Sequence, residues 1–278
     1  MNFVIFDLEW NGCFSKKLNT HINEIIEFGA VKLNEKLEII GKFNCLVRPF
    51  FSTRLSNSVK ELTMLTFEEI KKGVPFDYGY SKFRKFADGC VLMSWSTSDI
   101  EVLVSNLKIY KKLEVIPFMK KYADLQQYCH DMLGLSGSNA LGLQAAADML
   151  SIDTEEIPHH RALGDSMITA LCLKKLYHCA ALRSYIQDAL HIDFYDRIFF
   201  HSYTIEEDDG SLDFAGVFFN CPECGARCSN SRPFIAKLKG FASEFVCTEC
   251  GYKFTGRLSF KRKYDSTVLS KKVIRHMV

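Results

Sequence analysis

Four cysteines close to the C-terminus form two matching segments, residues 221–225 (CPECG) and residues 247–251 (CTECG). A tight turn at each glycine aims backbone amides at the sulfurs, and four thiolates at this spacing can close a tetrahedral Zn²⁺ site. The chain has 11 cysteines, an odd number, and residues 1–7 lack a basic secretory region. Reduced, metal-binding thiols are therefore favoured over disulfides. The pattern predicts one structural Zn²⁺ bound by Cys221, Cys224, Cys247 and Cys250.

The residues around these cysteines predict a small β-rich zinc-ribbon domain, because apolar and basic residues between the two segments can supply its strands. A redox dithiol is a poor alternative, since there are two cysteine pairs and no thioredoxin-like unit around them. Cys228 is expected to be a bystander, although it could compete as a ligand. Cations interleaved with aromatic rings favour a grip on nucleic acid, and a purely structural or protein-binding ribbon is the alternative. These residues are Arg227, Arg232, Lys237, Lys239, Lys253, Arg257, Lys261, Arg262 and Lys263, with Phe234, Phe241 and Phe254.

Charge is divided unevenly along the 278 residues. Residues 216–278 contain 12 Lys or Arg and 4 Asp or Glu, a net of +8, so the whole-chain charge of +2 leaves −6 for residues 1–215. A basic end on an acidic body suits a module that meets phosphate, and a solvated basic face is the alternative. No run approaches the roughly 18 apolar residues that cross a bilayer, so we expect a cytoplasmic protein without a membrane partner.

Residue patterns before position 190 predict an α/β fold, with a mixed sheet flanked by helices. Apolar or β-rich runs predict strands at 2–8, 24–33, 38–48 and 90–94, with a turn at 34–36 joining the second and third. Helical periodicity predicts helices at 77–88, 98–112, 140–150 and 164–190.

The pattern changes at about 190–196, where we place a domain boundary. Two β-like runs, 197–205 and 212–220, flank a strong turn signal at 206–211 and predict a hairpin. The predicted domains are 1–190, then the hairpin and zinc ribbon over 196–265, then a basic tail over 266–278.

Acidic residues far apart in the chain stand at strand ends or helix starts. Asp7 and Glu9 are two residues apart, which puts both carboxylates on one face of the first strand. Asp99 begins one predicted helix, and Asp165 lies near the start of another, after His160 and four intervening residues. Singly, each has a simpler explanation as a solvated strand end or as a first-turn carboxylate favoured by the helix dipole.

Together and in this order, the residues resemble the DEDDh family of 3′–5′ exonucleases, related to RNase T and the DNA polymerase III proofreading subunit. The resemblance covers roughly residues 2–178 and implies an RNase H-like fold. Residues 27–31 look like the family's second strand, and residues 61–66 resemble its Leu-Thr-Gly-Ile-Thr segment, with Met64 in place of glycine. Arg161 stands where the sister class has tyrosine. The segments that look closest to the KapD-like, small-RNA-trimming branch are 6–11, 118–125 and 160–162.

The resemblance implies a role for each side chain of the pattern. Asp7 would bind both of two Mg²⁺ or Mn²⁺ ions, and Glu9 and Asp165 would bind the more tightly held one. Asp99 would act closely or through water. His160 would be the general base for the attacking water, because an imidazole accepts protons near neutral pH.

Further positions are less directly implied. His159 is expected to be a supporting or loop residue, because His160 alone has the x4 spacing to the last acid. Trp10, Asn11 and Leu65 match positions that touch the 3′-terminal nucleotide in the family, with core packing as a rival explanation for Trp10 and Leu65.

Crowded carboxylates indicate bound metal on physical grounds as well. Two unit charges 4 Å apart near a protein surface repel by about 4 kcal/mol, and hard cations prefer oxygen ligands. What the resemblance implies is a 3′–5′ exonuclease that releases nucleoside monophosphates by two-metal-ion hydrolysis, with single-stranded RNA favoured as substrate. The alternatives are a DNA-directed exonuclease of repair or proofreading type and a catalytically silent nucleic-acid-binding adaptor.

Overall fold

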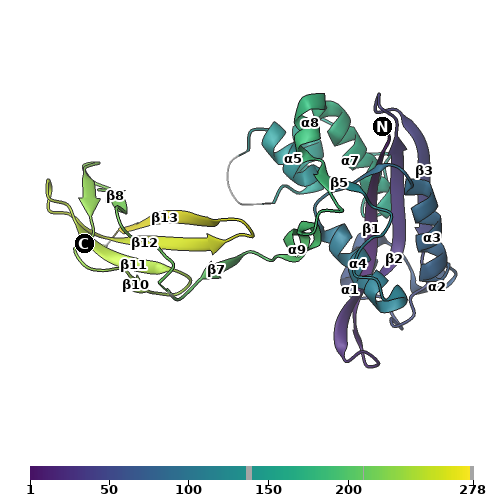
Figure 1. Cartoon of the computed structure of the whole chain (residues 1–278), viewed down its shortest axis with the longest axis horizontal. Coiled ribbons are helices and arrows are strands. Elements are labelled where there is room, and N and C mark those ends of the chain that lie inside the picture. Colours follow the sequence, from purple (N-terminus) through teal and green to yellow (C-terminus); the bar gives the residue numbers. More distant parts are fainter. Residues whose placement is uncertain (136–139, 209, 276–278) are drawn as a thin grey trace. The chain divides into compact units, whose positions relative to one another are not determined.

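The computed structural model describes residues 1–135, 140–208 and 210–275, and the chain divides into two compact units, Met1–Ile198 and Phe199–Val278 (Figure 1). The division falls slightly after the predicted boundary, because Phe194 and Ile198 of helix α9 (Phe194–Phe199) are buried in the core of the first unit. Among the described residues, no helix has both the length and the apolar character needed to cross a membrane.

A six-stranded mixed sheet forms the centre of the first unit, and it confirms the predicted fold class. The strand order is β3-β2-β1-β4-β5-β6, in which β1 and β5 pair with β4 in parallel and the remaining pairs are antiparallel. The strands are β1 (Phe3–Ser15), β2 (Thr20–Leu33), β3 (Ile39–Leu46), β4 (Val91–Ser94), β5 (Lys121–Asp124) and β6 (Gln187–Asp188).

The helices of this unit are α1 (Asn57–Thr63), α2 (Phe67–Lys71), α3 (Phe76–Ala87), α4 (Ser98–Lys111), α5 (Leu125–Met132), α6 (Leu143–Met149), α7 (Ala162–Leu176), α8 (Cys179–Tyr185) and α9. The prediction of one helix over 164–190 is wrong, because the chain breaks between α7 and α8. The Tyr128 hydroxyl donates to Leu176 O at 2.8 Å and accepts from His178 N at 3.1 Å. These two bonds replace helical hydrogen bonds at the break.

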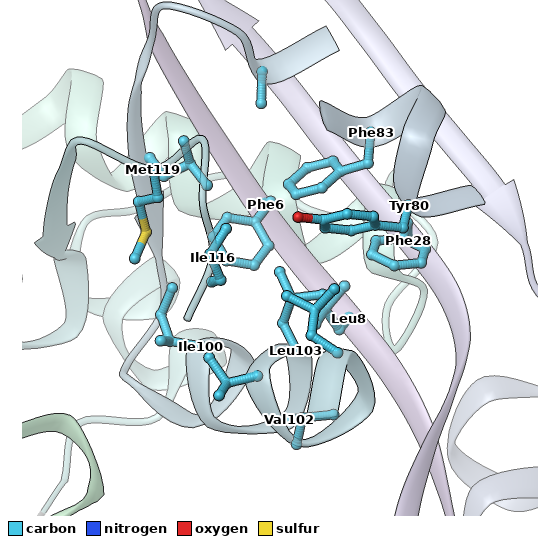
Figure 2. Close-up of a cluster of buried hydrophobic side chains, with 14 of the residues drawn as sticks. Phe6, Leu8, Phe28, Tyr80, Phe83, Ile100, Val102, Leu103, Ile116 and Met119 are labelled. Atoms are coloured by element: carbon cyan, nitrogen blue, oxygen red, sulfur yellow. The ribbon is translucent and has the colours of Figure 1, made fainter. Parts of the chain in front are cut away.

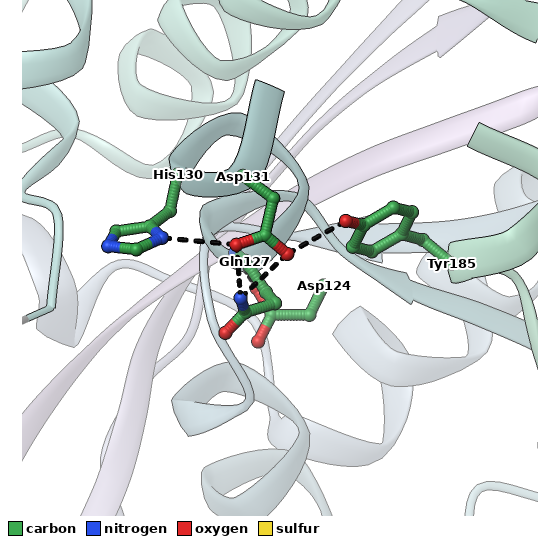
Figure 3. Close-up of polar contacts among 5 residues, drawn as sticks. All are labelled: Asp124, Gln127, His130, Asp131 and Tyr185. Carbon is green, nitrogen blue, oxygen red and sulfur yellow. Dashed lines mark hydrogen bonds and ion pairs between the residues drawn. The ribbon is translucent and has the colours of Figure 1, made fainter. Parts of the chain in front are cut away.

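A polar cluster around Asp131 joins α5 to α8 (Figure 3). The Asp131 carboxylate accepts hydrogen bonds from Gln127 Nε2 at 2.9 Å and from the Tyr185 hydroxyl at 2.7 Å, and it lies 3.1 Å from His130 Nδ1. The bonds from Gln127 and then Tyr185 lower the pKa of Asp131. The cluster therefore holds an ionised carboxylate between two helices.

Apolar side chains cover both faces of the sheet. On one face Phe83 of α3 packs against Phe6 and Phe28, with ring centroids 5.4 and 5.5 Å apart (Figure 2). On the other face Ile5 and Leu173 belong to a second cluster formed with α5, α6 and α7. Burial on both faces explains why β1 begins with a continuous apolar run.

Two glycines permit close backbone contacts at the first turn of α7. A Cβ on Gly29 of β2 would lie 2.0 Å from the Ala162 carbonyl carbon, and a Cβ on Gly164 would lie 1.8 Å from Pro158 O. A larger residue at either position requires the backbone to move. Gly29 therefore lets the first turn of α7 lie against β2, and Gly164 lets the preceding loop fold back against that turn.

Replacing Gly29 by alanine should displace the first turn of α7 and lower the free energy of unfolding by roughly 1–3 kcal/mol. Gly12→Ala is the matched control, because a Cβ there meets only Asn23 Oδ1, at 3.4 Å. Tryptophan fluorescence in urea reports on this unit, since both tryptophans of the chain, Trp10 and Trp95, belong to it. Equal unfolding midpoints for the two variants would contradict the packing argument.

The second unit is built from strands. Its main sheet has the order β10-β11-β12-β13, with β7 also paired to β12, and β8 pairs with β9 in a separate two-stranded sheet. The strands are β7 (Tyr203–Ile205), β8 (Phe218–Asn220), β9 (Arg227–Ser229), β10 (Ile235–Ala236), β11 (Phe241–Val246), β12 (Lys253–Arg262) and β13 (Thr267–Arg275). Phe245, Phe254 and Leu258 are among its core residues.

Two predictions for this unit are wrong within its described residues. The run 197–205 does not form a hairpin with 212–220, because β7 pairs with β12, where Ile205 packs against the core beside Phe260. The predicted basic tail over 266–278 is instead largely strand β13, because the long alternating strand β12 can pair along both edges. Residues 276–278, and Asp209 of the predicted turn, lie outside the described residues.

Candidate active site and cysteine cluster

Three predicted metal-binding carboxylates come together where β1 meets α7. Strand alternation places Asp7 and Glu9 on the face of β1 that packs against α7, and Asp165 lies in the first turn of that helix. Each residue offers a carboxylate oxygen within 4.8 Å of those of the other two. Oxygen donors at this spacing fit a hard divalent cation such as Mg²⁺ or Mn²⁺.

Asp99 lies beside this group and is held by the backbone of β1. Its Oδ1 accepts a hydrogen bond from Leu8 N at 2.9 Å, and its side chain is buried in the first turn of α4. The turn that leads into α4 contains Ser96 at φ 89, and the Tyr122 hydroxyl donates to Ser96 O at 2.8 Å. The bond from Leu8 N holds the start of α4 against the middle of β1, and the left-handed turn at Ser96 leads the chain into that helix.

Burial and mutual repulsion favour the protonated form of these carboxyl groups. Burial, followed by the charges of Asp99 and Glu9, raises the pKa of Asp7 well above its ordinary value. Burial and the charge of Asp165 raise the pKa of Glu9 to about 8. Burial also raises the pKa of Asp99 to about 8 and raises that of Asp165, which the charge of His160 opposes. Full ionisation therefore requires added positive charge.

The metal-free protein should lose stability as pH rises. Because the pKa values are raised, the folded protein holds more protons than the unfolded chain above the ordinary carboxyl range. This stabilisation is complete below about pH 4 and is lost as pH rises through about 8. Divalent cations replace protons on the same oxygens, so Mn²⁺ should raise the thermal midpoint more near pH 8.5 than near pH 6. Tryptophan fluorescence measures the midpoint, and an equal shift at both pH values would contradict this explanation.

Both histidines of the predicted pair are exposed and line the same cleft as the carboxylates. His160 adopts φ 52, a left-handed conformation, immediately before Arg161 begins α7 as its N-cap residue. A strained backbone at a site of this kind is typical of a functional position. The charge and a backbone amide of His160 both lower the pKa of Asp165, and the charge of His159 lowers it as well, against the larger effect of burial.

An ion pair next to this site was not predicted from the sequence. Arg161 donates from Nε to Glu27 Oε2 at 3.0 Å and from a terminal nitrogen to Glu27 Oε1 at 2.8 Å. Glu27 is fully buried and pairs with Glu9 across β2 and β1. The bidentate contact joins the segment that bears His160 to the sheet, and it compensates a buried charge that would otherwise be costly. The sequence signal that could have revealed this ion pair is Glu27, a charged residue inside the mostly apolar second half of β2.

The carboxylates and histidines line a cleft of about 850 Å³. Trp10 and Trp95 provide aromatic walls, and Val59 and Leu62 of α1 provide an apolar one. The Trp95 indole donates to Leu141 O at 3.0 Å, which orients the ring. The cleft thus combines an acidic cluster with flat apolar surfaces of the kind on which bases stack.

Of the three predicted substrate contacts, Trp10 alone is placed on the cleft. Leu65 does not line the cleft, contrary to the prediction. It is 4% exposed and packs with Ile26, Leu55 and Ile70. The exposed Leu62, one turn earlier, takes its place on the wall.

Asn11 does not line the cleft either, because it is 1% exposed and both polar atoms of its side chain are hydrogen-bonded within the protein. Its Nδ2 donates to Ser52 Oγ and Arg54 O, each at 3.1 Å, and its Oδ1 accepts from Ser56 N at 2.9 Å. Since Ser56 is the N-cap of α1, Asn11 positions the helix that forms the apolar wall. Met64, which follows α1, has φ 56, a conformation that suits the glycine of the family pattern.

The four paired cysteines gather in the second unit, and their sulfurs lie within 4.8 Å of one another. Cys221 Sγ is 3.6 Å from Cys250 Sγ, and Cys224 Sγ is 3.5 Å from Cys247 Sγ. The two segments form matching turns, in which Gly225 N donates to Cys221 O and Gly251 N to Cys247 O, each at 2.9 Å. Backbone amides of Cys250 and Glu249 lower the pKa of the Cys247 thiol to about 6, whereas burial and hydrogen bonds with the neighbouring thiols raise the pKa of Cys250 to about 12. A thiolate set of this geometry fits Zn²⁺.

Several known proteins are similar to this chain. DNA polymerase III PolC-type from Thermotoga petrophila is 25% identical over 168 residues, which are 60% of this chain and 11% of that protein. ERI1 exoribonuclease 2 from Homo sapiens is 27% identical over 203 residues, covering 62% of this chain and 28% of that protein. This chain therefore spans less than a third of the length of these relatives.

Solved structures share the fold. A 3′-exonuclease in a structure of 3′-end-specific recognition of a histone mRNA stem-loop aligns with a TM-score of 0.56 at 24% identity, covering 69% of this chain and 68% of that one. The nuclease domain of 3′hExo, a DEDDh family member bound to rAMP, aligns with a TM-score of 0.54 at 24% identity, covering 63% and 90%. A family model described as an exonuclease (RNase T) matches residues 4–173, more than half of the chain. The chain therefore belongs to the RNase T family of exonucleases.

Proposed function

We propose that this protein is a metal-dependent 3′–5′ exonuclease that releases nucleoside monophosphates from single-stranded 3′ ends, with RNA as the preferred substrate. The observation that carries the proposal is the group of three carboxylates, Asp7, Glu9 and Asp165, with oxygens within 4.8 Å of one another in a cleft of about 850 Å³. Their raised pKa values indicate a site that cations complete.

Each side chain then has a separate task. Asp7, Glu9 and Asp165 would hold two divalent cations, which when bound supply a nucleophilic water and stabilise charge building on the phosphate. His160, exposed at the cleft, would accept the proton of the attacking water. Asp99 would hold the middle of β1 through its bond from the Leu8 amide and act on the cations directly or through water.

The cleft walls suggest how a terminal nucleotide is held. An aromatic face stacks a base for about 1–3 kcal/mol, and Trp10 and Trp95 are placed to do so. Leu62 of α1 would contact the base or sugar from the apolar wall.

Support for RNA comes from two sources. The segments resembling the KapD-like, small-RNA-trimming branch suggest it, and one relative is named an exoribonuclease, while one similar structure describes recognition of histone mRNA. The PolC-type relatives are DNA polymerases by name, so a DNA-directed exonuclease is the second candidate.

Asp7→Asn should lower the rate of mononucleotide release by at least ~10²-fold, because it removes a charged ligand from the centre of the carboxylate cluster. Matched single-stranded RNA and DNA labelled at the 3′ end provide the assay, with Mg²⁺ and Mn²⁺ tested separately. Asp88→Asn is the control, since Asp88 is exposed after α3 and remote from the cleft lining. Faster wild-type cleavage of DNA would replace the RNA preference. Tight binding without cleavage in either metal would establish the silent adaptor instead.

We also propose that Cys221, Cys224, Cys247 and Cys250 bind one structural Zn²⁺. The support is the closeness of their sulfurs and the two matching turns, which present amides to sulfur as zinc-binding turns do. The small core of this unit is rich in phenylalanine but has few other apolar residues, so metal binding would contribute to its folding.

Cys221→Ser should therefore abolish zinc binding and lower the thermal stability of the second unit. Cys228→Ser is the matched control, because Cys228 is another buried thiol of the same unit outside the group of four. Elemental analysis of the purified proteins should find about one zinc per chain in the wild type and in Cys228→Ser. Zinc loss in the control, or retention in Cys221→Ser, would reassign the ligands.

A further inference from the structure

One side of the five-stranded sheet in the second unit carries a row of cations. Along β12 the even-numbered residues from 254 to 260 are buried in the phenylalanine core, so strand alternation places the odd-numbered residues on the other side. The register with β13 puts Lys272 directly opposite Arg257 on that side. We call this side the basic face, and its cations are Lys253, Arg257, Lys261 and Lys272.

Little negative charge offsets these cations. Arg257 has Ala242 beside it on β11 and Lys272 beside it on β13, and it donates a hydrogen bond to the Lys237 carbonyl at 3.5 Å. Glu244, the acid that the described strands place on this face, lies 3.6 Å from Arg232. Like charges directly opposite on neighbouring strands destabilise a sheet, so the pairing of Arg257 with Lys272 is unfavourable for folding.

The basic face is uncovered by the described elements of its own unit. The β8–β9 hairpin packs on the opposite side, where a Cβ on Gly256 would lie 2.7 Å from Phe219 Cε2. On the basic face, Val246, Ile235 and Ile274 are 40, 58 and 39% exposed. Aliphatic side chains in this position leave the cations accessible to a ligand that lies flat on the sheet.

We propose that the basic face binds the phosphate backbone of a single-stranded nucleic acid, which extends the proposed exonuclease function to a second contact with its substrate. Lys253, Arg257 and Lys261 are four residues apart, about 13 Å between neighbours at ~3.3 Å per residue, so the row can follow several nucleotides. The strand positions described on this face include no aromatic ring. Binding therefore depends on charge, independently of sequence and strongly on salt.

The test compares two triple variants in the full chain carrying Asp7→Asn. Lys253→Gln/Arg257→Gln/Lys261→Gln removes the row, and Lys36→Gln/Lys85→Gln/Lys120→Gln removes equal charge from exposed positions of the first unit. Fluorescence anisotropy measures affinity for single-stranded oligouridine across a range of KCl concentrations. Each cation that binds a phosphate contributes ~0.7 to the slope of log affinity against log salt, so the slope should fall by about 2 in the first variant and stay unchanged in the second. Equal slopes in the two variants would overturn the proposal. Displacement of RNA by polyglutamate of equal charge would do the same, because it would identify an acidic protein as the partner.

The variant Lys272→Glu separates a role of this residue in binding from a role in folding, because the two measured quantities should change in opposite directions. It places a carboxylate opposite Arg257, so the thermal midpoint of the second unit should rise while RNA affinity falls at least ~10-fold. A stabilised variant that binds RNA as well as the wild type would contradict the assignment.

A small substrate separates this proposal from the exonuclease proposal. With Asp7 intact, the row variant should hydrolyse the p-nitrophenyl ester of thymidine 5′-monophosphate at the wild-type rate, whereas KM for oligouridine should rise. Failure of the wild type to hydrolyse the ester would count against the exonuclease alone, because the binding measurements decide the basic face by themselves.

Discussion

Repulsion among carboxyl groups where the middle of β1 meets α7 is the constraint on which the rest of the first unit depends. Asp7, Glu9 and Asp165 lie within 4.8 Å of one another, and burial with mutual charge raises their pKa values. Such a group holds together only if rigid elements oppose the repulsion. The close approach of α7 at Gly29 and the bond from Leu8 N to the carboxylate of α4 provide that rigidity. The strain is relieved by protons or by cations, which is what a metal-dependent nuclease requires.

Positive charge is concentrated in residues 216–278 of the second unit, whereas the cleft of the first unit is acidic, and both features suit a polyanionic substrate. An acidic cleft repels phosphate until cations bind, so a nuclease of this type benefits from attraction supplied elsewhere. The second unit supplies positive charge at its C-terminal end: residues 216–278 carry a net +8, although the whole unit, with 12 Lys or Arg and 9 Asp or Glu, carries +3 and the first unit −1. Its basic face keeps Arg257 opposite Lys272 at the expense of sheet stability. The proposed contact with nucleic acid gives this like-charge pair a role in binding.

The spacing of the motifs identified the candidate metal ligands, whereas side-chain packing determined which of the other candidate residues reach the cleft. Asp-x-Glu, His-x4-Asp and the two C-x-x-C pairs were visible because metal chemistry restricts residue type and separation together. The predictions that Leu65 and Asn11 contact the substrate were wrong, because metal chemistry does not restrict the positions of apolar or amide side chains. Leu65 is buried, and Leu62 lines the cleft instead. The side chain of Asn11 makes its hydrogen bonds to the segment that leads into α1.

By itself, the sequence determined the mixed α/β fold of the first unit, its acidic residues and the four cysteines, because periodicity and ligand type are local properties of the chain. The tertiary structure decided which strands pair in the second unit, where β7 and β13 both join β12, since strand pairing depends on partners distant in sequence. It also decided the pairing of Arg161 with Glu27, 134 residues apart. A buried charge selects its partner by proximity in the folded chain, which no local pattern records.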